Sequence, residues 1–332
     1  MTLRKLNSVL LITLFAAGCT PADVPVDAPP AEPEATASAA ADPMAEFGTL
    51  ASNVFFYYAD LDAAHAFYSQ VLGLRTAADY GYAKIMQVAP SAFVTLVDAA
   101  QGMHSADEPK TTAIALVTDQ LDEWWDHINT QGVDMRSTEY SPTQGSAHDG
   151  FVAVDPEGYL LEFERFNPHP ENERFVPVLD GLPTLYPEPG TSNVPTGLGF
   201  KATIVWFYYN DLDAIQRFYE DVMGFDMIVD QGWTKIYPIG PAGFLGLVDQ
   251  SRGMHRYTEQ KGVTLSLITG NIDGWFGYVA GRKDIRMRHD AVVDEELYRA
   301  FVAYDPEGYF LEWDVFKSAP ANDTLLPAIE GR

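Results

Sequence analysis

The chain contains two copies of one long unit. The segment DLDAAHAFYSQVLGL begins at Asp60 and aligns with DLDAIQRFYEDVMGF, which begins at Asp211, 151 residues later. DPEGY occurs at Asp155 and again at Asp305, 150 residues later. A repeat of this length indicates two whole domains, because the units of solenoid proteins are only about 20–50 residues long. We therefore expect two similar domains at residues 50–167 and 201–317.

The segments outside the two copies have a different composition. Residues 19–47 are rich in proline, alanine and acids, and contain no lysine or arginine. Such a segment buries too little apolar surface to fold, so we expect a disordered tether there. Residues 168–200 carry seven prolines and are predicted to be an irregular connector, and residues 318–332 form a C-terminal tail.

The first residues are typical of a secretory signal. Arg4 and Lys5 precede the apolar run VLLITLFAAG, which is too short to span a membrane. The ending AAGC resembles a bacterial lipobox, and Cys19 is the only cysteine of the chain. We expect residues 1–18 to be a lipoprotein signal peptide and Cys19 to carry the lipid. The residue that follows, Thr20, favours the outer membrane of the bacterial envelope, facing the periplasm. An ordinary signal peptide with an incidental cysteine is the alternative.

Charge and motifs exclude several functions. The formal net charge of −26 disfavours DNA, RNA and anionic membrane surfaces as partners, so we expect membrane contact through the lipid anchor only. Acylation of Cys19 would leave no thiol for catalysis. No phosphate-binding loop, Ser/His/Asp arrangement or dinucleotide fingerprint occurs in the sequence.

Each copy is predicted to hold the same order of elements twice. NVFFYYA is a strand by its aromatic and β-branched content, and Asp60 is a natural N-cap for the helix that follows. AKIMQV and AFVTLVD are further strands. The order restarts with TAIALVT and a helix at LDEWWDHINTQG, and DPEG predicts a hairpin between FVAV and YLLEF. Each copy is therefore expected to be βαβββ twice.

This order, with DLDxxxxFYxxVLG after the first strand and DPEGxxxE at the last, resembles the vicinal-oxygen-chelate (VOC) superfamily. Its members include glyoxalase I, bleomycin-resistance proteins and extradiol dioxygenases. The resemblance implies an α+β fold with two tandem VOC domains, in which two βαβββ modules form a curved mixed sheet around a cleft. It does not define a reaction, because this fold supports many chemistries.

The resemblance also implies where a metal would bind. The last glutamate of the DPxGxxxE pattern is a ligand in the metal enzymes, and Glu162 and Glu312 stand at that position. Zinc, nickel and ferrous iron prefer imidazoles or several carboxylates. We therefore expect no metal and no other cofactor. The other ligand positions are Asn53, Thr95 and Thr112 in the first copy, and Ile204, Gly246 and Val263 in the second.

Two interpretations of Glu162 and Glu312 remain open. Each is either a hydrogen-bond acceptor or raised-pKa acid at the floor of a ligand cleft, or a structural group satisfied by backbone donors or by Lys84 or Lys235. A metal-dependent alternative combines these glutamates with histidines of the two GMH loops. Its ligands would be Glu162, His104, Glu312 and His255.

Strand alternation suggests the lining of the clefts. If the face of the first strand that carries Phe55 and Tyr57 lines a cleft, the aromatic wall suits a flat or apolar small molecule. The same aromatics could instead fill a closed cleft. Trp124 and Trp275 are predicted to lie in the core, and the five remaining histidines on the surface or in connectors. The candidate ligand-binding residues are Asn53, Phe55, Tyr57, Thr95, Thr112, Glu162, Trp206, Tyr208 and Glu312.

Three functions follow from these patterns. The first is a glyoxalase/bleomycin-resistance-like envelope lipoprotein that binds a small, partly aromatic or apolar ligand without metal, its two domains pairing within the chain. The second is a metal-dependent lyase, isomerase or dioxygenase with a non-standard site. The third is an envelope scaffold with filled clefts. The sequence assigns no catalytic residue.

Overall fold

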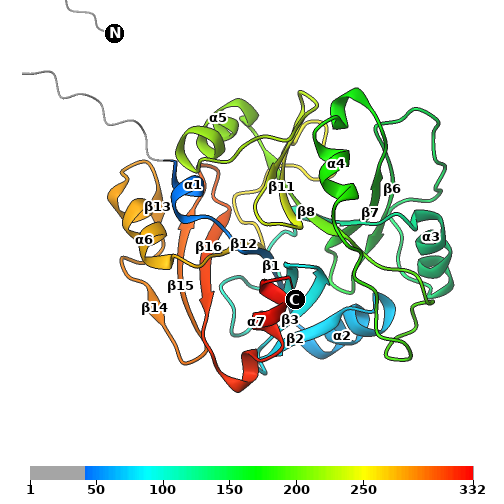
Figure 1. Ribbon diagram of the computed structural model, residues 1–332, viewed down its shortest axis with the longest axis horizontal. Helices are drawn as coiled ribbons and strands as arrows, with labels where there is room; N and C mark the ends of the chain where they lie inside the picture. Colours follow the sequence, from blue (N-terminus) through cyan, green and yellow to red (C-terminus); the bar gives the residue numbers. More distant parts are fainter. Residues whose placement is uncertain (1–41, 332) are drawn as a thin grey trace, which may run out of the picture. The chain divides into compact units, whose positions relative to one another are not determined.

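Residues 42–331 are described by a computed structural model (Figure 1). The expected signal peptide, Cys19 and all of the tether before residue 42 lie outside the described residues. None of the helices between residues 42 and 331 has both the length and the apolar character needed to cross a membrane.

The two copies of the repeat form four modules. The first comprises β1 (Ala51–Tyr58), α2 (Leu61–Ala66), β2 (Arg75–Asp79), β3 (Ala83–Ala89) and β4 (Ala92–Asp98). The second comprises β5 (Thr112–Val117), α3 (Leu121–Thr130), β6 (His148–Val154) and β7 (Leu160–Phe166). The third comprises β8 (Ala202–Tyr209), α5 (Leu212–Arg217), β9 (Val229–Asp230), β10 (Thr234–Pro238) and β11 (Gly243–Asp249). The fourth comprises β12 (Val263–Ile268), α6 (Ile272–Gly281), β13 (Arg286–Met287), β14 (Val293–Asp294), β15 (Tyr298–Tyr304) and β16 (Phe310–Phe316).

The predicted helix starts are confirmed. The Asp60 carboxylate accepts a hydrogen bond from the backbone N–H of Ala63 at 2.9 Å, and Asp211 caps α5 in the same way. In both copies the helix continues as one π-helical turn, at Phe67–Val71 and Phe218–Val222. The predicted hairpin is also confirmed, because β6 and β7 pair antiparallel around DPEG.

The strands form two mixed sheets, and each sheet takes strands from both copies. Sheet A runs β13-β15-β16-β12-β1-β4-β3-β2, with β14 paired to β15. Sheet B runs β6-β7-β5-β8-β11-β10-β9. β1 pairs antiparallel with β12, and β5 with β8, so the first module joins the fourth and the second joins the third (Figure 1). The expected α+β fold with curved mixed sheets is confirmed, while the modules combine across the copies.

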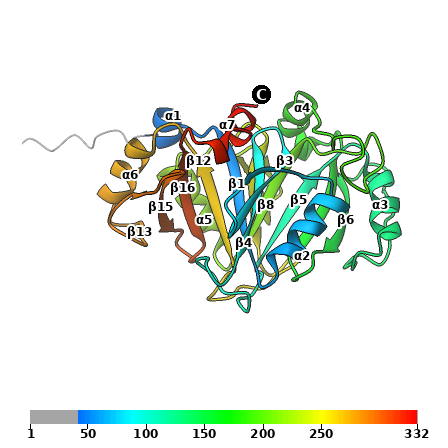
Figure 2. The ribbon, with the colours of Figure 1, turned by 90° about the horizontal axis from the view of Figure 1, so that it is seen from below.

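One face of each sheet is covered by the longer helices, and a continuous apolar core lies beneath them (Figure 2). Trp124 on α3 and Trp275 on α6 are fully buried in this core, as predicted. The side chains on the opposite face of each sheet form separate apolar clusters. The candidate clefts lie on that opposite face.

The connector and the tail form a further pair of repeats that the sequence analysis missed. Residues 168–200 contain the short helix α4 (Phe175–Asp180) as well as irregular chain, and residues 318–331 contain α7 (Leu325–Ile329). α4 packs on this opposite face of sheet B, and α7 packs on the opposite face of sheet A. Asn172 and Asn322 lie before these helices, and the amide of each donates to two backbone carbonyls.

Two tyrosines of the DPEGY segments link the two sheets. Tyr159 directly precedes β7 of sheet B. Its hydroxyl accepts from the backbone N–H of Tyr57 in β1 at 2.9 Å and donates to the carbonyl of Gly262 at 2.5 Å. Gly262 directly precedes β12, so both partners belong to the sheet A side. Tyr309 of the fourth module links sheet A to sheet B in the same way. Its hydroxyl accepts from the Tyr208 N–H at 2.9 Å and donates to the Thr111 carbonyl at 2.8 Å. We call Tyr159 and Tyr309 the crossing tyrosines.

The crossing tyrosines predict a stability effect. Replacing Tyr159 or Tyr309 by Phe leaves a buried N–H and a buried carbonyl without their partner, so each substitution should lower the free energy of unfolding by about 2–4 kcal/mol. Urea denaturation measures this change. Tyr186→Phe, at an exposed position, should stay within about 0.5 kcal/mol of the parent. Losses below that level for both crossing tyrosines would contradict the role given to them.

Candidate functional site

The face of sheet A opposite α2 and α6 holds a cavity of about 290 Å³, which we call cleft A. Its walls come from both copies: β1, β3 and β4 on one side, and β15, β16 and the loop after β13 on the other. Most of the lining is apolar or aromatic, with a few polar groups. The principal lining residues are Phe55, Tyr57, Tyr80, Tyr82, Ala83, Thr95, Arg288, Tyr298, Glu312, Asp314 and Phe316.

Two acids of β16 stand side by side in cleft A. Glu312 and Asp314 are two residues apart on one strand and therefore point to the same face. They are only 8% and 2% exposed. Asp314 Oδ2 lies 2.5 Å from the Ser266 hydroxyl, whereas Glu312 Oε2 has no hydrogen-bond partner among residues 42–331.

Burial governs the ionisation of both acids. It raises the pKa of Glu312 well above its usual range, and the charge of Asp314 raises it further. Burial also raises the pKa of Asp314 to about 7, although the Ser266 hydroxyl lowers it. The positive charge of Arg288 partly offsets the rise in the pKa of Glu312.

Several polar groups of the neighbouring strands are already paired with one another, although Asn53 Nδ2 has no partner among residues 42–331. The Thr95 hydroxyl donates to Asn53 Oδ1 at 3.0 Å, and the Tyr57 hydroxyl lies 2.8 Å from the Thr264 hydroxyl. Both pairs are buried. Glu312 is therefore the acceptor in cleft A that a ligand can still satisfy.

The equivalent hollow on sheet B, cleft B, is much smaller. Its cavity is about 110 Å³ and is lined by Glu162, Trp206 and Tyr208 among others. The ring of Trp206 occupies the space above Gly246, where an added Cβ would lie 1.9 Å from a ring carbon. Phe55 and Thr95 hold these two positions in cleft A. Because Gly246 has no side chain, the Trp206 indole fits over it and fills most of cleft B.

One acid of cleft B, Glu164, has a partner within the chain at its Oε1 atom, whereas its Oε2 atom has none among residues 42–331. His148 Nδ1 lies 2.8 Å from Glu164 Oε1, and the side chain of His148 is 42% exposed. The hydrogen bond with Glu164 raises the pKa of His148 to about 9. Burial, together with the charge of Glu164, raises the pKa of Glu162 to about 8.

The predicted site residues divide between the two clefts. Phe55, Tyr57, Thr95 and Glu312 line cleft A, with Asn53 beneath them, and Glu162, Trp206 and Tyr208 line cleft B. The expectation that each copy supplies its own set of ligand positions is wrong, because the sheets combine the first module with the fourth and the second with the third.

Thr112 was placed on the wrong face. It pairs with Phe207 and donates to the Trp206 carbonyl, whereas Ala113 and Ala115 share the face of Trp206. A shift of one residue reverses every side chain of a strand. The same shift applies to Val263, which lies in the helix-covered core.

The expected lysine partners of the glutamates were also wrong. Lys84 Nζ lies 2.7 Å from Asp79, and Lys235 Nζ lies 2.7 Å from Asp230. Each lysine therefore pairs with an aspartate of the adjacent strand. Neither lines the cleft that holds a buried glutamate.

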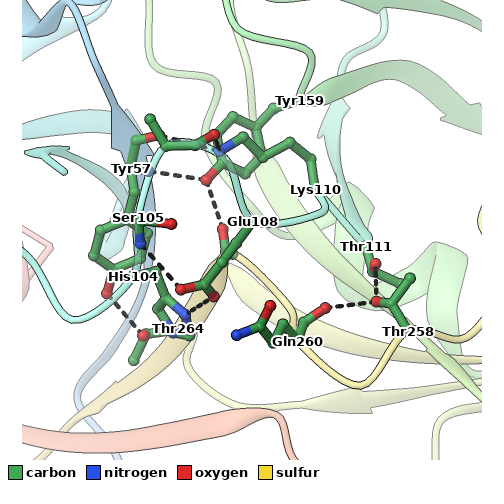
Figure 3. A network of polar contacts seen from close by, with 12 residues as sticks. Tyr57, His104, Ser105, Glu108, Lys110, Thr111, Tyr159, Thr258, Gln260 and Thr264 are labelled. Carbon is green, nitrogen blue, oxygen red and sulfur yellow. Dashed lines mark hydrogen bonds and ion pairs between the residues drawn. The ribbon is translucent and has the colours of Figure 1, made fainter.

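The two GMH-loop histidines lie beside the clefts. The His104 ring contacts Tyr57 and Phe310, and its Nδ1 lies 2.6 Å from Glu108 Oε2, which also accepts through its other oxygen from the Ser105 N–H (Figure 3). His255 contacts the Tyr208 ring, and burial lowers its pKa to about 4. His104 lines a polar cavity that is separate from cleft A, where Glu312 lies.

The donor set does not fit the superfamily's usual metal. In cleft A the ligand-like positions hold an amide and a hydroxyl bonded to each other, a valine that faces away, and one carboxylate. Zinc or ferrous iron would require imidazoles or more carboxylates. No group of three His, Cys, Asp or Glu side chains suited to a metal occurs between residues 42 and 331.

The sequence analysis missed the second acid of each cleft. Glu164 and Asp314 follow Glu162 and Glu312 by two residues, and strand alternation alone would have placed them on the same face. The predicted surface position of His148 is confirmed, since its side chain is 42% exposed. Its contact with Glu164 was not predicted.

Comparison with known proteins supports the fold assignment. The sequence profile of the Glyoxalase/Bleomycin resistance protein/Dioxygenase superfamily matches residues 51–163. Those residues therefore resemble this superfamily, and the two copies together have the fold of glyoxalase I.

Solved structures align over most of both copies. Glyoxalase I from Zea mays is similar with a TM-score of 0.55 and 14% identity, covering 85% of this chain and 94% of that chain. A candidate dioxygenase from Bacillus subtilis is similar with a TM-score of 0.55 and 16% identity, covering 80% and 85%. At these identities the similarity establishes the fold alone. No protein with a curated description matches the chain.

The buried acids predict a pH-dependent stability. The folded protein retains the proton of Asp314 up to about pH 7, whereas the unfolded chain releases it near its usual pKa of about 4. The contribution of Asp314 to stability therefore falls as the pH rises between these values. Relative to the parent, Asp314→Asn should become more stable by about 2–4 kcal/mol between pH 4 and pH 8, measured by urea denaturation. A difference that does not change with pH would contradict the burial of an ionisable acid here.

Proposed function

We propose that this protein is an envelope lipoprotein whose cleft A binds a small, flat, partly aromatic ligand without a metal. The observation that carries the proposal is the cavity of about 290 Å³ walled by aromatic side chains around one unsatisfied acceptor. Ligand pockets of proteins are mostly apolar, with a few polar groups that orient the ligand.

The shape of the cavity favours a planar molecule. Phe55 and Tyr57 from β1 face Tyr298 and Phe316 from the other half of sheet A. Aromatic rings stack on or meet the edges of other rings, and such contacts add to the free energy of burial. A volume near 290 Å³ accommodates a two-ring or three-ring compound, whereas cleft B, at about 110 Å³, accommodates only a few atoms.

Binding without metal is supported by the donor set of the cleft. The Thr95 hydroxyl donates to Asn53 Oδ1, so this amide oxygen is already occupied and is a poor ligand for a cation. The chemistry of the site is then recognition by packing and hydrogen bonding. No group in cleft A is given a catalytic role.

Filling cleft A should abolish ligand binding. The probe is N-phenyl-1-naphthylamine, an uncharged fluorophore whose emission rises in apolar sites, titrated into the chain from residue 20 onward. Ala83 lines cleft A, and its counterpart Thr234 lines cleft B. Ala83→Phe should weaken binding at least about tenfold by occupying the cavity, and Thr234→Phe should change it less than about twofold. Equal effects of the two variants, both shown to be folded by thermal denaturation, would refute cleft A as the site.

The lipid anchor is tested on the full chain. The proposal predicts that a Gram-negative host incorporates an alkyne-tagged palmitate into the parent protein, which then sediments with membranes. Cys19→Ser should lose the label and move to the soluble fraction, because Cys19 is the only thiol. An unlabelled parent protein would overturn the lipoprotein assignment without affecting the cleft.

A further inference from the structure

The acid pair of cleft A lacks the cation that the acid pair of cleft B has. In cleft B, His148 lies 2.8 Å from Glu164. The counterpart of His148 in the second copy is Tyr298, since both residues open the strand that pairs with the acid-bearing strand: His148 lies opposite Phe166 and Tyr298 opposite Phe316. The acids of both clefts line a cavity, but only cleft B has an imidazole in contact with one of its acids.

The protein supplies little positive charge of its own to cleft A. The charge of Arg288 influences Glu312, but its guanidinium lies over the Phe310 ring, 5.2 Å from the ring centroid. The other titratable side chains that line the cavity are His289, Tyr57, Tyr80, Tyr82 and Tyr298. Two carboxyl groups against one arginine make cleft A acidic whenever both are ionised.

Glu312 points to a ligand by its own geometry. Its side chain is more than nine-tenths buried and lines the cavity, and its Oε2 atom has no partner among the residues described. A buried acceptor without a donor is costly, and a charged donor satisfies it better than a neutral one. The tyrosine rings around the acids add attraction for a cation.

We propose that the ligand of cleft A is an organic cation: a planar aromatic or apolar body that carries a protonated amine, whose N–H groups donate to Glu312 and Asp314. This inference rests on the proposed function of cleft A and names the class of its ligand. The imidazole of His148 in cleft B is the intramolecular counterpart of the ammonium group. The strongly acidic chain, with a formal net charge of −26, would also concentrate cations near the cleft.

Two probes of the same shape test the charge. 2-Naphthylmethylamine is protonated at pH 7.5, and 2-naphthylmethanol is its neutral counterpart; both are titrated calorimetrically into the chain from residue 20 onward. We expect the amine to bind about tenfold or more tightly than the alcohol. Glu312→Gln keeps the shape of the side chain but removes its charge, so the ratio of the two dissociation constants should fall to about one while the affinity for the alcohol is retained.

A second variant provides an independent test that does not remove an acid. Tyr298→His copies cleft B by placing an imidazole beside the acids of cleft A, and should reduce the preference for the amine. The matched control is His148→Tyr in cleft B, which should leave that preference unchanged.

The outcomes separate the inference from the proposed function. Equal affinities for the two probes, or a preference that survives Glu312→Gln, would overturn the cationic ligand and leave cleft A as a binding site. Failure of both naphthyl probes and of N-phenyl-1-naphthylamine to bind would overturn both. A tenfold preference that is lost in Glu312→Gln would support both.

Discussion

The structure depends on two buried aspartates, one in each DPEG turn. Asp155 accepts hydrogen bonds from the hydroxyls of Tyr58 and Tyr68 at 2.7 and 3.2 Å, and its other oxygen accepts from the backbone N–H groups of its own turn. Asp305 has the same partners in the second copy. Four hydrogen bonds offset much of the desolvation of a carboxylate, and they attach the last hairpin of each copy to its first strand and helix. The crossing tyrosines extend from the same turns. These hydrogen bonds hold the two modules of one copy together, while the strands of each module pair with strands of the other copy.

That pairing determines where a site can form. Because β1 joins β12 and β5 joins β8, the aromatic wall of cleft A belongs to the first module and its acids belong to the fourth, more than 200 residues away. Neither copy alone would hold the cleft. Duplication then allowed the two clefts to differ: Trp206 over Gly246 fills cleft B, and Phe55 with Thr95 leaves cleft A open. Cleft B thus keeps a cavity of only about 110 Å³, and cleft A one of about 290 Å³.

Much of the local structure was predictable because its causes are local. The N-caps Asp60 and Asp211 and the DPEG hairpins follow from side chains that bond within a few residues. Glu312 could be recognised as buried, and Glu162 as partly buried, from the apolar residues around them. The combination of modules could not be predicted. β5 and β12 are the corresponding strands of the two copies, so either could pair with β1, and only long-range packing selects β12. The error at Thr112 has the same origin: its face depends on register, and a one-residue difference is decisive in a strand.

The acid pairs show why the two clefts need different partners. A second carboxylate two residues along a strand raises the free energy of ionising the first, so such a pair is costly unless a proton or a cation lies beside it. In cleft B the chain provides that cation with His148, and the cavity is only about 110 Å³. In cleft A a tyrosine stands at the equivalent position, and the cavity is about 290 Å³. A purely structural role for the acids would favour the same solution in both copies. The internal cation is absent from the larger cavity and present in the smaller one, which is the arrangement expected if a ligand completes cleft A.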